Sequence, residues 1–114
     1  MTEVVLVEAV DAYTSVAVRG RLDPTGVGEV ELKLTSHTVA RRKPAIIDLT
    51  EVGLISSVGI GMLVAIARSL RSHGIGIAVV ASPHVRSILE LTHTGALIPV
   101  VATREEALRT LGLA

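Results

Sequence analysis

The fold is decided by the stretch PAIIDLTEVGLISSVGIGML, which occupies residues 44–63. Residues 45–47 form a continuous apolar run, which is typical of a strand covered on both faces. A short loop then leads to Ser56 and Ser57, where a hydroxyl could accept a hydrogen bond from a free amide of a first helical turn. After the serines the apolar period becomes helical, at Leu63, Ile66, Ala67 and Leu70. The stretch therefore predicts a buried strand, a loop and a helix that starts at the serines.

The same stretch resembles the signature of STAS domains, the family of anti-sigma-factor antagonists and of a domain of sulfate transporters. The usual core of that family is an aspartate, a phosphorylatable serine, a serine or threonine, and then Gly-Leu-Gly. In this chain Ser57 takes the place of the phosphorylatable serine, and residues 59–61 read Gly-Ile-Gly. Ser56 replaces the acidic residue of the family, and Val58 replaces the second hydroxyl. Strand, serine and glycines thus follow the family order, with two departures beside the serine.

The resemblance covers most of the chain and implies its fold. It predicts an α/β protein with a STAS-like (SpoIIAA-like) mixed sheet of about five strands and about four helices, in a single domain of residues 1–114. The bend Gly20-Arg21-Leu22-Asp23 also resembles the family. The resemblance implies that one surface contacts a protein partner, and its candidate residues are Asp23, Ser56, Ser57, Val58 and Gly59.

The rest of the chain alternates between strand and helix patterns. Apolar runs at 4–10 and 13–18, with a short break at 11–12, predict a hairpin, and Pro24 bars further extension of the second strand. Further patterns predict a helix at about 25–38, a strand at 75–81, a helix that stops near residue 95, a strand at 97–101 and a last helix after Thr103. Strands that alternate with helices indicate a sheet with right-handed crossovers.

Three helix ends carry recognisable signals. Gly74 can adopt the left-handed conformation that ends a helix, and Ser82 before Pro83 is a favoured helix start. Thr103 and Glu106 have the spacing of a capping box.

Composition excludes several classes of function. The eleven basic and eleven acidic side chains cancel, and Tyr13 is the only aromatic residue, so neither charge nor base stacking favours direct binding of nucleic acid. The chain has no cysteine, which excludes disulfides, thiol catalysis and cysteine-bound metal. No apolar segment approaches the roughly 20 residues that span a bilayer, and the N-terminus lacks the pattern of a signal peptide. We expect a cytoplasmic protein that neither inserts into a membrane nor carries a cofactor.

Catalytic and metal sites are poorly supported. A Ser-His-Asp triad could be drawn from Ser57, Asp48 and one of four histidines, but Ile55 occupies the position at which a nucleophile elbow needs glycine. The histidines lack the spacing of a metal pair, and Val64 stands where a dinucleotide fingerprint needs its third glycine. We therefore expect no enzyme activity, no metal and no cofactor.

Helical geometry adds Met62 to the candidate surface. At about 100° per residue, Val58 and Met62 fall away from the side that carries Leu63 and Ile66. The two are four residues apart and lie close to Ser57, and methionine is frequent at adaptable binding surfaces. Two scattered surface residues would explain the same pattern. We nevertheless predict that Ser57, Val58 and Met62 form one exposed patch.

The resemblance implies an anti-sigma-factor antagonist. Such a protein binds an anti-sigma factor, often a serine kinase, and so frees a sigma factor, and phosphorylation of the serine matching Ser57 would end the binding. A bare helix cap explains a serine at this position equally well from structure alone. Another soluble STAS role, as a scaffold of a signalling assembly or a subunit beside a transporter, is the alternative.

Overall fold

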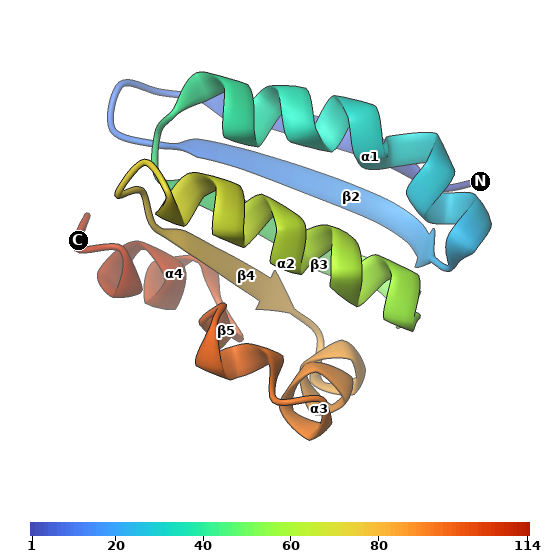
Figure 1. The fold of residues 1–114 in the computed structure, drawn as a ribbon. Coiled ribbons are helices and arrows are strands. Elements are labelled where there is room, and N and C mark those ends of the chain that lie inside the picture. Colours follow the sequence, from blue (N-terminus) through green and yellow to red (C-terminus); the bar gives the residue numbers. More distant parts are fainter.

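Five strands form one mixed sheet in the order β1-β2-β3-β4-β5, and the computed structural model describes all 114 residues (Figure 1). The strands are β1 (Glu3–Ala9), β2 (Thr14–Leu22), β3 (Ala45–Ile55), β4 (Ile77–Ala81) and β5 (Val100–Val101). The helices are α1 (Pro24–Thr38), α2 (Ser57–Arg71), α3 (Pro83–Leu91) and α4 (Arg104–Thr110), with 3-10 turns η1 (Val39–Arg41) and η2 (Thr94–Ala96). β1 is antiparallel to β2, and the other neighbours are parallel. The predicted order of elements and the STAS-like mixed sheet are confirmed.

Helices cover both faces of the sheet. Ile47 points into the larger core, which the helices α1, α2 and α3 close, and Ile46 points to the opposite face, where it packs with Ala107 of α4. Successive side chains of a strand point to opposite faces, so a strand buried on both sides reads as an unbroken apolar run. The run at residues 45–47 was therefore a correct sign of a central strand.

β3 is longer than the sequence pattern indicates, and the prediction of a loop before the serines is wrong. The strand runs to Ile55, and its second half pairs only with β2, because β4 ends opposite Leu49. Val52 and Ile55 are buried in the larger core, which holds this segment against the helices. β2 and β3 thus project together beyond β4, and α1 and α2 start at their carboxyl ends (Figure 1).

The three helix-end signals are confirmed. Gly74 has a φ of +70°, and the hydroxyl of Thr103 accepts a hydrogen bond of 3.2 Å from the amide of Glu106. Ser82 is the N-cap of α3 and Pro83 lies in its first turn, as predicted, and the Ser82 side chain makes no capping hydrogen bond. None of the helices has both the length and the apolar character that a membrane crossing requires.

Candidate functional site

One backbone atom, the carbonyl oxygen of Leu22, joins the start of α2 to the end of β2, directly before α1 begins. This oxygen accepts hydrogen bonds from the backbone amide of Ser56, at 2.9 Å, and from the Ser56 hydroxyl, at 2.8 Å. The Ser56 oxygen also accepts a longer bond of 3.4 Å from the amide of Gly59, and so caps α2. Ser56 is therefore the N-cap of α2, and its hydroxyl is used both as donor and as acceptor.

Ser57 is the first residue of α2 and is exposed. Its hydroxyl has no hydrogen-bond partner within the protein, in contrast to that of Ser56. The unbonded amides of the first turn and the positive end of the helix dipole lie beside it, and both favour a negative group at this position. Of the two adjacent serines, Ser57 presents the free hydroxyl.

Asp23 lies directly after Leu22 and is the N-cap of α1. Its carboxylate accepts a hydrogen bond of 2.7 Å from the amide of Gly26, and it lies 3.6 Å from Nε of Arg21. The bond from Ser56 to Leu22 therefore brings the caps of α1 and α2 to the same end of the sheet. Asp23 and Ser56, which are far apart in the sequence, therefore lie together with Leu22, and these three residues are called the corner below.

Gly59 is buried against this corner and offers no side chain to a partner. A β-carbon at this position would lie 2.7 Å from the carbonyl oxygen of Leu22 and 2.9 Å from Cγ1 of Ile55. The glycine is needed so that the first turn of α2 can approach the end of β2. Gly59 was predicted to belong to the partner-binding surface, but it is buried and has no side chain with which to contact a partner.

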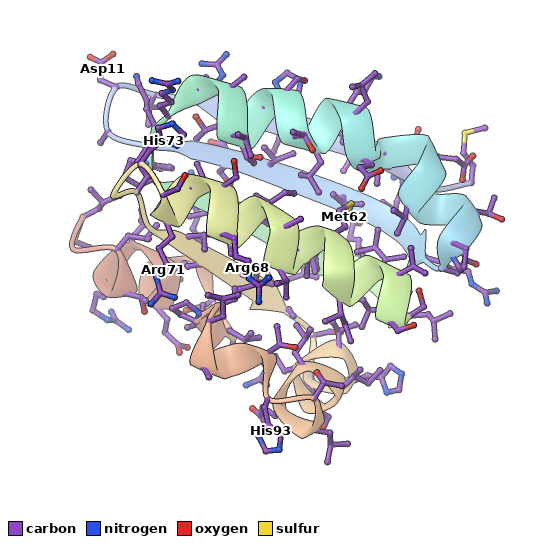
Figure 2. The ribbon with its side chains drawn as sticks, in the orientation of Figure 1. Asp11, Met62, Arg68, Arg71, His73 and His93 are labelled. Atoms are coloured by element: carbon purple, nitrogen blue, oxygen red, sulfur yellow. The ribbon has the colours of Figure 1, made fainter.

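Met62 is buried, so the predicted exposed patch of Ser57, Val58 and Met62 does not exist. Only 3% of Met62 is exposed, because α1 packs against that flank of α2 (Figure 2). Val58, one turn earlier, is 45% exposed. The observed candidate surface therefore consists of Asp23, Ser57 and Val58, with Ser56 behind them.

The structure does not assemble the hypothetical triad. No hydrogen bond joins a histidine to Ser57 or to Asp48, and the Asp48 carboxylate instead accepts bonds from the amide and hydroxyl of Thr50. His73 lies at the C-terminal end of α2 and His93 beside α3 (Figure 2). No group of three histidine or carboxylate side chains could hold a metal ion.

Sequence reasoning missed the carbonyl of Leu22, the atom on which the corner depends. A backbone carbonyl has no residue type that could reveal it. The only available signal was the Gly-Arg-Leu-Asp bend, which marks the end of β2 without showing what lies against it.

The charged groups whose pKa values are shifted belong to two ion pairs, Arg19 with Glu3 and Arg104 with Glu8. Nη1 of Arg104 donates a hydrogen bond of 2.6 Å to Glu8, and Nη2 donates one of 2.7 Å to the Tyr13 hydroxyl. The hydrogen bond and charge of Arg104 lower the pKa of the Glu8 carboxyl. This cluster joins α4 to the β1–β2 hairpin.

Comparison with known proteins agrees with this architecture. Residues 4–107 match the STAS domain family. BtrV of Bordetella bronchiseptica is 24% identical to this chain, over 88% of this chain and 87% of its own length. Its name describes it as an anti-sigma factor antagonist by inference. An anti-sigma factor antagonist from Mycobacterium paratuberculosis has a similar crystal structure, with a TM-score of 0.81 and 28% identity over 98% of this chain and 95% of its own.

The phosphorylated form of SpoIIAA, from Bacillus, shares the fold with a TM-score of 0.65 and 20% identity, over 92% of this chain and 96% of its own. With the family match spanning nearly the whole sequence, this chain belongs to the STAS domain family.

Proposed function

We propose that this protein is an anti-sigma-factor antagonist that is switched by phosphorylation of Ser57. The unmodified chain binds an anti-sigma factor of the serine-kinase type through the surface of Asp23, Ser57 and Val58, and so releases a sigma factor. Phosphorylation of Ser57 by that kinase ends the binding. The chain itself is not an enzyme in this account, and the ATP belongs to its partner.

The free hydroxyl of Ser57 is the observation that carries the proposal. A kinase can phosphorylate only a hydroxyl that is accessible at the protein surface and free to enter the kinase active site. The Ser56 hydroxyl is held by the carbonyl of Leu22 and the amide of Gly59, whereas Ser57 is exposed and unbonded. The relatives support the same reading, since they are named as anti-sigma factor antagonists and one of them has been seen in a phosphorylated form.

The position of Ser57 also explains how a phosphate could act without unfolding the protein. The group adds a charge of roughly −1.5 to −2, and the positive end of the α2 dipole can tolerate it. A partner that covers Ser57 would have to strip water from that charge, and burial of an unpaired charge is costly. The modification therefore favours the free protein over the complex.

The experiment combines phosphorylation with binding. The purified kinase-type anti-sigma factors of the same organism are incubated with the protein and ATP, and the modified residue is mapped by mass spectrometry. Phosphate is expected on Ser57, and Ser57→Ala should remain unmodified. Ser36, an exposed serine of α1, supplies the matched control, because Ser36→Ala should be phosphorylated like the wild type. Phosphate on Ser56 in the wild-type protein would contradict the proposal.

A further inference from the structure

The helix α2 carries two glycines in its first two turns, and their surroundings differ. Gly59 is required internally, because a β-carbon there would collide with the carbonyl oxygen of Leu22. Gly61 has no such reason, since a β-carbon at this position would meet no atom within 4 Å. Its φ is also outside the left-handed region in which glycine is favoured. Glycine lowers the stability of a helix interior relative to alanine, so Gly61 costs stability without serving the packing of this chain.

Gly61 lies on the solvent-facing side of α2, one turn after Ser57. Ser57, Gly61 and Ala65 follow one another at intervals of four residues and are all exposed. The backbone of α2 is therefore accessible at Gly61, directly beside the hydroxyl of Ser57. A segment of another protein could approach the helix axis more closely here than anywhere that carries a side chain.

A groove of about 180 Å³ between α1 and α2 continues this surface. Met62 and Ile66 are its buried residues, and Ala65 and Glu31 stand on its two sides. Glu31 is exposed, forms no ion pair and is the only charged residue that lines the groove. Gly28, one turn before Glu31, is a second exposed helical glycine at which a β-carbon would meet no atom within 4 Å. The groove is thus apolar at its base and negative at one wall, and the exposed glycines Gly28 and Gly61 lie on the two helices that form it.

We infer that a segment of the anti-sigma factor lies with its backbone against Gly61 and enters the groove between α1 and α2, with a lysine or arginine facing Glu31. The inference rests on the proposed function, because the partner is the one that covers Ser57. Continuity with the exposed Ser57 selects that partner, and the unpaired Glu31 selects a basic side chain within it. The missing side chain at Gly61 then has a role, since it allows close contact at the modified serine.

The test uses Gly61→Ala and Gly61→Leu with the purified kinase-type anti-sigma factors of the same organism. Gly61→Ala should raise the melting temperature by a few degrees, because alanine favours the helix. The same variant should bind more weakly than wild type, and Gly61→Leu should bind at least about tenfold more weakly, which corresponds to about 1.4 kcal/mol. Ser36→Ala is the control: it also improves helix propensity on an exposed face, and its affinity should not change. A purely structural role of Gly61 would not produce a more stable protein with a weaker complex.

A second arm tests the charge. Glu31→Lys should weaken binding at low salt, and the loss should shrink as salt screens the charges. Glu90→Lys on α3 makes the same charge change outside the groove and should have a much smaller effect.

The outcomes separate this inference from the proposed function. If Ser57→Asp weakens the complex while Gly61→Leu binds as tightly as wild type, the contact at Gly61 is refuted and the proposed function stands. A fall in melting temperature for Gly61→Ala would show that the glycine has an internal role, which also refutes the inference. If no kinase-type anti-sigma factor of the organism binds the wild-type protein, both fall together.

Discussion

The hydroxyl of Ser56 donates a hydrogen bond of 2.8 Å to the carbonyl oxygen of Leu22, 34 residues earlier in the chain. The amide of Ser56 donates to the same oxygen at 2.9 Å. These two bonds join the start of α2 to the corner at which β2 becomes α1. The exposed Ser57 and the cap residue Asp23 therefore occupy one end of the molecule, as a surface for a single partner requires.

Ser56→Ala should destabilise the protein. The substitution removes the cap of α2, which costs about 1 kcal/mol, and also removes the side-chain bond to Leu22. Ser56→Thr keeps a hydroxyl that can donate and accept, so most of the stability should remain. Urea denaturation of the two variants and of Ser57→Ala, whose hydroxyl is unbonded, measures the difference. Equal stability of Ser56→Ala and wild type would show that the bond to Leu22 contributes nothing.

Gly59→Ala should also destabilise the corner, by about 1–3 kcal/mol, because the added methyl group overlaps the backbone of Leu22. The matched control is the same substitution at Gly95, where a β-carbon has no neighbour within 4 Å. Thermal unfolding followed by circular dichroism compares the two. A Gly59→Ala protein as stable as the Gly95→Ala protein would mean that α2 can shift away from β2 at no cost.

Met62→Ala should cost about 2–5 kcal/mol, since the side chain is buried between α1 and α2 and its loss leaves a cavity. Leu32→Ala is the control, because Leu32 is 85% exposed on α1, and its effect should stay within about 0.5 kcal/mol. Denaturant midpoints at constant slope give both values. A loss of stability in Met62→Ala as small as that in Leu32→Ala would indicate that the Met62 side chain is exposed, as the helical pattern alone predicts.

The ion pair between Glu8 and Arg104 should make stability depend on pH in the acid range. Arg104 lowers the pKa of the Glu8 carboxyl in the folded protein, so the unfolded chain binds the proton more readily. The contribution is then complete above the ordinary carboxyl pKa of about 4.3 and is lost as pH falls through the lowered folded value. Glu8→Gln should be less stable than wild type at pH 7. This difference in stability should disappear at pH values below the lowered pKa of the Glu8 carboxyl.

The matched control for that measurement is Glu90→Gln, since Glu90 is exposed and its carboxylate has no ion-pair partner in the protein. Its difference from wild type should be small at every pH. A Glu8→Gln difference that stays constant with pH would show that the charge of Glu8 is not what stabilises the hairpin against α4.

The sequence was informative where a pattern reflects the whole environment of an element. The apolar run at residues 45–47 requires two covered faces and so identified the central strand, and Leu63, Ile66 and Leu70 marked the core side of α2. The site was partly predictable as well, because the sequence indicated a capping serine at position 56 or 57, and the structure assigns the cap to Ser56. Ser57 and Val58 are exposed as expected.

The errors arose where a second element decides burial. A helical pattern does not reveal that α1 covers one flank of α2, so Met62 was predicted to be exposed although it is buried. Glu51 and Gly53 resemble loop residues, yet pairing with β2 keeps their segment extended. The carbonyl of Leu22 had no signal, because any residue supplies the same atom.

The central claim is that phosphorylation of Ser57 controls binding of the anti-sigma factor. The most direct measurement is the dissociation constant of the partner for the unmodified protein and for protein carrying phosphoserine at position 57, with melting temperatures recorded for both. The account predicts that the phosphorylated protein stays folded, with a melting temperature within a few degrees of the unmodified one, and binds at least about tenfold more weakly. Equal dissociation constants for the two folded forms would contradict it.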